Sequence, residues 1–267
     1  MKVVQYKKPE TIAEAYELLS SNQKNEVIGG GAWLKLASKS VECLISLDNL
    51  GLKEISETAE FVFIGAKATI RDLEISPVVR DLQGGLLAEA ANSIMGINVR
   101  NIATIGGSVM GRFGFSDILT ALLAMEAGLV FYDQGEIALK DYLELKRPKR
   151  DILLSIKIGK QEALSAFHKE ARTRLDFAIL NLAVVKTPNK ITIAVGSRPM
   201  GAVLATNTMG YLAMKQHLDD HDLEVAAKMI SEELEFKDNL KASAEYRLHL
   251  ARVWSYRLLK AVIGNED

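Results

Sequence analysis

Two glycine-rich segments are the residues best suited to chemistry in this chain. Gly29-Gly-Gly31 follows the apolar run Glu26-Val-Ile28, and Thr104-Ile-Gly-Gly107 closes an apolar run, predicted to be extended, that begins at Val99. Glycine lets successive backbone amides turn toward one anion, so such loops bind phosphate without a lysine. Two of them brought together would hold both phosphates of a dinucleotide. Neither has the spacing Gly-x-Gly-x-x-Gly of a Rossmann site, and a plain tight turn is the alternative for each.

The sequence lacks the common signatures of hydrolytic, zinc and nucleoside triphosphate chemistry. His217 and His221 are four residues apart, but they lie among aspartates, which favours a solvated helix junction over a metal site. Cys43 is the only cysteine, so the chain can form no internal disulfide. Because a [2Fe–2S] cluster normally takes four thiolate ligands, any such cluster belongs to a partner.

Composition excludes several classes of partner. Lysine and arginine number 33 against 34 aspartates and glutamates, and a net charge of -1 gives no basic field for nucleic acid or an anionic membrane. The amino terminus lacks the apolar core of a signal peptide, and no apolar run approaches the roughly 20 residues of a membrane span. We expect a soluble, cytoplasmic protein of two modest domains.

The apolar pattern predicts strands and helices in alternation. Thr11 and Glu14 have the spacing of a capping box, which predicts a helix over about 11–20. Further along the chain we expect strands at 43–47 and 61–65, helices at 69–75, 85–95 and 117–125, β-rich runs at 177–185 and 190–195, and a last helix over 243–263. These elements must bring the two glycine segments together.

The order and spacing of several motifs resemble the FAD-binding subunits of the xanthine dehydrogenase and carbon monoxide dehydrogenase families. The resemblance spans nearly the whole chain. The segments that carry it are Gly29-Gly-Gly-Ala-Trp-Leu34, Ile64-Gly-Ala-Lys-Ala-Thr69, Val99-Arg-Asn-Ile-Ala-Thr-Ile-Gly-Gly107, Ser116-Asp117, Phe167-x-Lys169-x-x-Arg172, Asp176-x-Ala178 and Ala242-Ser-Ala-Glu-Tyr-Arg247. Of these, the segment that ends at Gly107 is the most specific to the family.

The resemblance implies an α+β fold. It consists of a two-lobed FAD-binding domain of the vanillyl-alcohol-oxidase-like (PCMH-type) class, followed by a smaller α+β domain. The expected FAD-binding domain covers residues 1–160, with lobes of about 1–55 and 56–160, and the C-terminal domain covers 161–267.

The same resemblance places the diphosphate of FAD between the two glycine segments. The residues that it assigns to the cofactor there are Val27, Ile28, Gly29, Gly30, Gly31, Ala32, Trp33, Leu34, Thr104, Gly106, Gly107 and Ser108. Ala32 and Trp33 stand where the family usually has a hydroxyl residue and a polar one, which shifts phosphate binding toward backbone amides. No histidine is near either segment, so we expect FAD to be bound noncovalently.

Three further residues are assigned to the cofactor by the resemblance. Asp117 is expected to accept hydrogen bonds from the adenosine ribose, and its alternative role is to cap the helix over 117–125. Leu153 is expected to lie against the flavin, with plain core as the alternative. Lys169 is expected near the isoalloxazine edge, where a cation favours the reduced anionic flavin, and its alternative is a surface lysine.

The function implied is electron relay within a molybdenum hydroxylase complex. A large subunit with the molybdenum cofactor would oxidise the substrate, and [2Fe–2S] clusters on a small subunit would pass electrons to this chain's FAD, then to NAD+ or another acceptor. Phe113 and Phe115 are candidates for a docking surface, with burial as the alternative. Two rival functions remain, a self-contained flavoprotein oxidase and a degenerate scaffold subunit without FAD.

Overall fold

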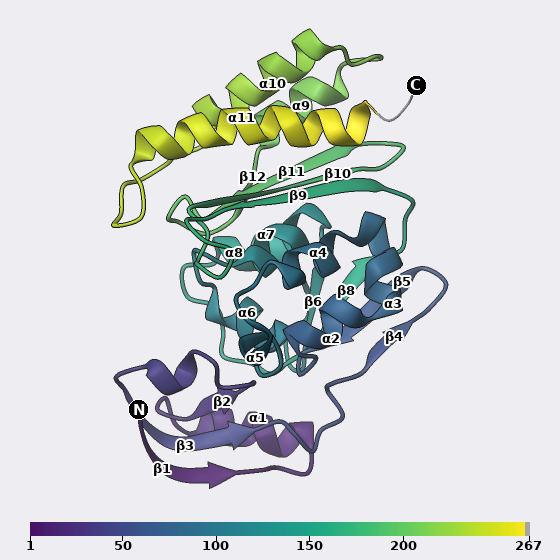
Figure 1. Ribbon diagram of the computed structural model, residues 1–267. Coiled ribbons are helices and arrows are strands. Elements are labelled where there is room, and N and C mark those ends of the chain that lie inside the picture. The colour runs from purple at the N-terminus through teal and green to yellow at the C-terminus, as the bar shows by residue number, and fades with distance from the viewer. Residues whose placement is uncertain (265–267) are drawn as a thin grey trace. The chain divides into compact units, whose positions relative to one another are not determined.

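The computed structural model describes residues 1–264, which form two compact units (Figure 1). The first unit comprises Met1–Leu73, Gly96–Gly111 and Ala127–Gly159, and the second comprises Glu74–Met95, Arg112–Glu126 and the described residues from Lys160 onward. The chain therefore leaves the first unit and returns to it twice before it remains in the second. The domain boundary expected after residue 160 stays a prediction, since compactness alone groups two earlier segments with the C-terminal region.

A three-stranded parallel sheet opens the first unit. Its strand order is β1 (Lys2–Lys7), β3 (Ser40–Ser46) and β2 (Glu26–Ile28), and helix α1 (Ile12–Ser21) precedes β2. The Thr11 hydroxyl accepts a hydrogen bond from the Glu14 amide at 3.1 Å, which fixes the start of α1 as predicted. Ala15 and Leu19 of α1 are buried with Cys43 and Ile45 of β3.

A five-stranded antiparallel sheet forms the rest of the first unit's core. The strand order is β4 (Ile55–Glu57), β5 (Phe61–Gly65), β8 (Leu153–Gly159), β6 (Gly128–Phe131) and β7 (Gly135–Ala138). The helical segments of this region are η1 (Leu34–Leu36), α2 (Ile70–Ile75), α5 (Ile97–Arg100), α6 (Ile105–Gly111) and α8 (Leu139–Glu144).

The extended run predicted from Val99 to Gly107 is wrong. The structure has α5 and α6 there, joined by a short turn in which only Thr104 bridges to Thr69. The flanking hydrogen bonds run from the Ile70 amide to the Ala103 carbonyl and from the Ile105 amide to the Ala68 carbonyl. Pairing with the segment after β5 therefore confines the extended backbone to one bridge, and tertiary contacts override the β-branched pattern.

The second unit is a four-stranded antiparallel sheet with helices on both faces (Figure 1). The strand order is β12 (Val203–Leu204), β11 (Ile191–Gly196), β10 (Leu180–Lys186) and β9 (Leu164–Glu170). Helices α9 (Thr206–Ala213), α10 (Asp220–Glu233) and α11 (Ala244–Ile263) lie on one side, and α4 (Leu86–Asn92) and α7 (Asp117–Ala124) lie on the other. Short segments α3 (Pro77–Asp81) and η2 (Leu82–Gly85) precede α4.

Strand β10 is buried on both faces, which explains why Asn181 is its only polar residue before the terminal Lys186. Arg247 in α11 is fully buried, and its guanidinium donates to the carbonyl oxygens of Ile179, Lys237 and Ala242. No helix within residues 1–264 is both long and apolar enough to cross a membrane.

Candidate functional site

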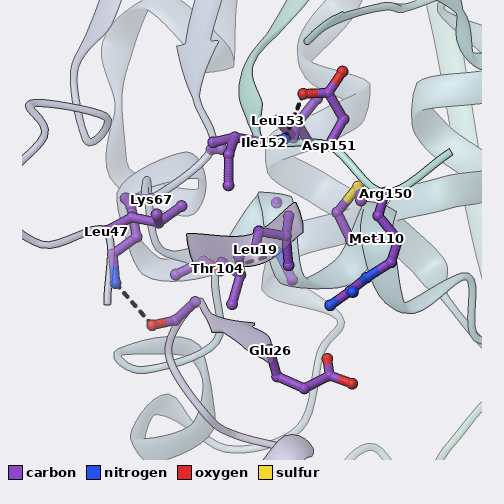
Figure 2. Close-up of a pocket in the computed structure, with 15 residues that line it drawn as sticks. Leu19, Glu26, Leu47, Lys67, Thr104, Met110, Arg150, Asp151, Ile152 and Leu153 are labelled. Atoms are coloured by element: carbon purple, nitrogen blue, oxygen red, sulfur yellow. Dashed lines mark hydrogen bonds between the residues drawn. The ribbon is translucent and has the colours of Figure 1, made fainter. Parts of the chain in front are cut away.

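A pocket in the first unit lies where its separate chain segments meet (Figure 2). The lining comes from α1 and β2, from the segment after β5, from the start of α6, and from the chain that enters β8. Its residues are Leu19, Glu26, Val27, Gly29, Leu47, Ala66, Lys67, Thr104, Gly106, Gly107, Met110, Arg150, Asp151, Ile152 and Leu153.

The first glycine segment presents backbone donors without partners. Within the described chain, the amides of Gly30, Gly31 and Ala32 donate no hydrogen bond. Gly31 has a φ of +71°, a left-handed conformation that side chains disfavour. Three consecutive free amides in a turn of this kind form a nest for an anion.

The two glycine segments touch through their backbones. A Cβ atom at Gly30 would lie 1.3 Å from the carbonyl oxygen of Ile102, and one at Gly29 would lie 2.5 Å from the Thr104 hydroxyl. The contact at Gly30 is with backbone, so no side chain fits there without moving a loop, whereas a side chain at Gly29 would displace the Thr104 side chain. Glycine at these positions therefore allows residues some 70 positions apart in the sequence to come together.

Most backbone amides of the second glycine segment are hydrogen-bonded within the protein. The amides of Ile105 and Gly106 donate to the carbonyl oxygens of Ala68 and Ala66 at 2.9 and 3.0 Å, and the Gly107 amide donates to the Thr104 hydroxyl at 3.1 Å. A Cβ atom at Gly106 would lie 2.6 Å from the Ala66 carbonyl oxygen. The second segment therefore forms a close-packed wall of the pocket, whereas the first segment has free amides that can donate hydrogen bonds to a ligand.

Lys67 brings a positive charge to the pocket. Its Nζ donates to the Gly29 carbonyl oxygen at 2.7 Å and lies 2.6 Å from the Asp48 carboxylate (Figure 2 shows the bond to Gly29). The hydrogen bond from Lys67 lowers the pKa of Asp48 below its usual range. The Lys67 side chain is 13% exposed, and that of Asp48 is 47% exposed.

The opposite side of the pocket is formed by Arg150 and the residues that follow it (Figure 2). The Arg150 guanidinium donates to the carbonyl oxygens of Asn22 and Asn25. Asp151 is buried and accepts from four donors, namely the amides of Asp133, Gln134 and Ile152 and the Gln134 side chain. These bonds fix the chain that carries Ile152 and Leu153 into the lining.

A second polar cluster lies inside the second unit. The Asp117 carboxylate accepts from the Asn181 amide group at 2.6 Å and lies 3.4 Å from Lys169 Nζ, which itself donates to the Ser93 carbonyl oxygen at 2.9 Å. Burial raises the pKa of Asp117, since desolvation outweighs the lowering by Lys169 and Asn181. Ser116, rather than Asp117, caps α7 through a bond from the Leu119 amide. The side chain of Lys169 is 7% exposed, so Lys169 is not a surface lysine.

Family models match both parts of the chain. Residues 2–160 match the FAD binding domain in molybdopterin dehydrogenase, a match that covers more than half of the chain. The chain belongs to this flavoprotein family. Residues 165–262 match the CO dehydrogenase flavoprotein C-terminal domain.

Similar proteins align over nearly the whole length of this flavoprotein. An uncharacterized protein of Escherichia coli K12 is 26% identical, over 94% of this chain and 93% of that protein. The nicotine 6-hydroxylase medium subunit of Paenarthrobacter nicotinovorans is 24% identical, over 91% of this chain and 92% of that subunit. A solved chain of carbon monoxide dehydrogenase from Hydrogenophaga pseudoflava is 26% identical, with a TM-score of 0.88 over 97% of this chain and 96% of that chain.

These findings confirm the broad expectations from the sequence. The flavoprotein is an oxidoreductase subunit of mixed α+β fold, with an FAD-binding domain followed by a C-terminal domain. The pocket fits the cofactor on structural grounds. The free amides of Gly30 to Ala32, in the loop that follows the lining residue Gly29, and the Lys67 ammonium suit a diphosphate, while Leu19, Leu47 and Leu153 offer apolar surface.

The structure brings some of the predicted site residues together and not others. Those that line the pocket are Val27, Gly29, Thr104, Gly106, Gly107 and Leu153. Ile28 ends β2, and Gly30, Gly31, Ala32, Trp33 and Leu34 form the loop that follows it. Ser108 lies in α6, where its hydroxyl donates to the Thr104 carbonyl oxygen at 3.2 Å. Asp117 and Lys169 pair with each other in the second unit.

Sequence reasoning missed the four charged residues of the lining, Glu26, Lys67, Arg150 and Asp151. Lys67 belongs to the segment Ile64-Gly-Ala-Lys-Ala-Thr69, which was recognised as a motif without a role for its lysine. The signal that could have identified Lys67 was its position in the sequence between the two glycine-rich segments. Phe113 and Phe115, proposed from the sequence as a docking surface, stack on each other at 5.2 Å, and Phe115 also contacts Phe177.

Proposed function

We propose that this chain is the FAD-binding electron-transfer subunit of a molybdenum hydroxylase complex. It receives electrons from [2Fe–2S] clusters on a small subunit and passes them to NAD+ or another acceptor. The observation that carries the proposal is the run of free amides at Gly30, Gly31 and Ala32, set against the packed wall of Thr104 to Gly107. FAD, when bound, supplies the redox chemistry, and the protein supplies binding and orientation.

Each residue in the first unit then has a physical task. The amides of the first glycine segment hold the diphosphate, and the second segment closes the site behind it. Leu153, which is 4% exposed, covers the flavin with apolar surface and excludes water. Asp117 and Lys169 of the second unit pair with each other at 3.4 Å, and the roles expected for them toward the ribose and the ring edge stay predictions.

The clusters and the molybdenum cofactor belong to partner subunits in this proposal. Cys43 is the only cysteine of the chain and is buried in β3, so the chain cannot supply the four thiolates of a conventional cluster. Within the described residues no group of three or more His, Cys, Asp or Glu is arranged to hold a metal ion. A cluster-bearing small subunit and a molybdenum-binding large subunit are therefore the proposed partners, in a cytoplasmic complex.

Noncovalent attachment of FAD is supported by where the nucleophilic side chains lie. All four histidines, His168, His217, His221 and His249, belong to the second unit. The pocket lining in the first unit contains neither histidine nor cysteine. FAD should therefore be released intact when the protein is denatured.

A matched pair of glycine variants tests the site. Gly107→Ala adds one methyl group to the pocket lining and meets only the Thr104 hydroxyl at 3.1 Å, whereas Gly159→Ala in β8 meets nothing within 4 Å. We expect Gly107→Ala to weaken FAD binding about tenfold and Gly159→Ala to leave it unchanged, measured by titration of flavin fluorescence. Equal affinity in both variants would place the diphosphate elsewhere, and absence of FAD binding in the wild type would favour the scaffold alternative.

The relay is tested by reduction of the flavin. The isolated FAD-loaded chain should keep its visible absorption when mixed with purines, aldehydes or alcohols, because in this proposal the large subunit oxidises the substrate. Co-expression with candidate cluster-bearing and molybdenum-binding subunits should yield a complex whose flavin is bleached by the substrate of the large subunit. Bleaching of the isolated chain by a small-molecule donor would instead identify a self-contained oxidase.

A further inference from the structure

Lys67 lies between the first glycine segment and the Asp48 carboxylate. It lies in the turn between β5 and α2, and its own amide is fixed by the Leu52 carbonyl oxygen at 2.7 Å. Its side chain reaches across to the first glycine segment, where Nζ contacts the Gly29 carbonyl oxygen and the Asp48 carboxylate. The ammonium group is thus held at the edge of the proposed diphosphate site.

Of the two cations in the pocket lining, only Lys67 has a partner that can be exchanged. The Arg150 guanidinium is bound to main-chain carbonyl oxygens of Asn22 and Asn25, which are part of the fold. Lys67 is paired with Asp48, a side chain that is 47% exposed. Asp48 also lies 3.9 Å from Lys8, a second cation that can balance its charge when Lys67 is taken away.

The first glycine segment needs a charged group from elsewhere. Ala32 offers no side-chain donor to the loop, so its polar contribution is limited to amides. Lys67, Gly29 and Gly107 line one pocket, and the loop with the free amides follows Gly29 directly. The two phosphates of one dinucleotide can therefore span the loop and the ammonium group.

We propose that Lys67 is the cation that recognises the diphosphate of the flavin dinucleotide, and that Asp48 holds Lys67 until the diphosphate displaces it. The inference rests on the proposed function, because it assumes that FAD binds at this pocket. A diphosphate carries more negative charge than one carboxylate, and its oxygens form strong charge-assisted hydrogen bonds with an ammonium group. Asp48, half exposed, returns to water and to Lys8.

The test compares FAD affinity in four single variants and one double variant of the full-length chain freed of flavin. Lys67→Met removes the charge, and Lys67→Arg keeps it. Lys53→Met is the matched control, because Lys53 is 67% exposed, pairs with Asp72 at 3.5 Å and does not line the pocket. Asp48→Asn removes the proposed competitor while keeping the shape of the side chain.

We expect Lys67→Met to raise the Kd for FAD about tenfold or more and to flatten its dependence on salt, with Lys53→Met like the wild type. Lys67→Arg should bind FAD more tightly than Lys67→Met. Asp48→Asn should lower the Kd severalfold, because the incoming phosphate no longer competes with a carboxylate. In the double variant Lys67→Met/Asp48→Asn that gain should vanish.

The outcomes separate this inference from the function on which it rests. If the wild type binds no FAD, the proposed function fails. If the wild type binds FAD and Lys67→Met behaves as Lys53→Met does, Lys67 is not the recognition cation. If Asp48→Asn weakens binding as much as Lys67→Met, Asp48 positions Lys67 instead of competing for it, and displacement is wrong. Thermal unfolding of each flavin-free variant checks that the fold is kept.

Discussion

Two lysine–aspartate pairs, one in each unit, have the same chemistry and opposite properties. Lys67 and Asp48 are 2.6 Å apart with Asp48 half exposed, whereas Lys169 and Asp117 are 3.4 Å apart with both side chains less than a tenth exposed. The pKa of Asp48 is lowered by its hydrogen bond from Lys67, and the pKa of Asp117 is raised by burial. Solvent access, rather than the presence of a cation, decides the sign of the shift.

The difference in solvent exposure also decides which of the two ion pairs can open. An ion pair in contact with water loses little free energy when it opens, since water replaces each partner. A buried pair cannot open without leaving a charge in a medium of low polarity. The pair in the first unit can therefore respond to a ligand, and the pair in the second unit should hold β9 and α7 in a fixed arrangement.

The largest effect is expected from removal of the buried cation. Lys169→Met leaves the Asp117 carboxylate buried without its counter-charge and should reduce the free energy of unfolding by about 3–5 kcal/mol at pH 7. Urea denaturation of the flavin-free protein measures it. The matched change in the other unit, Asp48→Asn, should cost less than about 1 kcal/mol. Similar losses in the two variants would abolish the distinction between the pairs.

A smaller effect is expected from the neutral partner of Asp117. Asn181→Leu keeps the branched shape of the side chain but removes its donor to Asp117 at 2.6 Å and its acceptor for the Thr120 hydroxyl at 2.8 Å. The Asp117 carboxylate then keeps only Lys169 and Ser93, and the Thr120 hydroxyl keeps only the Ser116 carbonyl oxygen. The loss of two buried hydrogen bonds should cost about 1–3 kcal/mol in the same denaturation assay. A loss below that range would mean that water enters the cluster and that the pair is less enclosed than its burial indicates.

The dependence of stability on pH should have opposite signs at the two aspartates. The raised pKa of Asp117 means that its contribution to stability is full below the ordinary aspartate pKa of 3.8 and is lost as the pH rises through its folded pKa. The lowered pKa of Asp48 means that its contribution is present above 3.8 and is lost as the pH falls through its folded pKa. The stability of the wild type relative to Asp117→Asn should fall from pH 3 to 7, and relative to Asp48→Asn it should rise. Slopes of equal sign would contradict the comparison.

The smallest effect is expected at Lys8, the second cation near Asp48. Lys8 lies 3.9 Å from Asp48 with about half of each side chain exposed, so Lys8→Ala should change the free energy of unfolding by less than about 0.5 kcal/mol. Thermal unfolding at low salt is the most sensitive measurement. A larger loss would show that Asp48 is held by two cations and is less free to leave Lys67.

Much of the fold was predictable because its elements carry local signals. The strand Phe61–Gly65 and the helix that ends at Ile263 agree with the apolar pattern almost residue for residue, and Thr11 caps α1 as its spacing indicates. The run from Val99 failed because its conformation depends on pairing with residues 68–70, which no local pattern announces. Tertiary contact decided between strand and helix there.

The glycine segments of the site were predictable, but the charges around them were not. Glycine is informative because few positions require it, whereas lysine and arginine are common on any surface. Lys67 gains its role from Gly29, 38 residues earlier, and Asp117 gains its burial from Asn181, 64 residues later. Such pairings are properties of the folded chain. The cofactor roles of Asp117 and Lys169 stay predictions.

The order of segments in the second unit has a consequence for synthesis on the ribosome. Helices α4 and α7 carry fully buried leucines, among them Leu86, Leu87 and Leu122, that pack with the sheet of β9, β10 and β11. Strand β10 begins about 55 residues after α7 ends. At typical elongation rates α7 waits roughly 3–11 s for that strand, and α4, made earlier, waits longer. During this interval their apolar faces are exposed, so the nascent chain offers a chaperone-binding surface that the finished protein lacks.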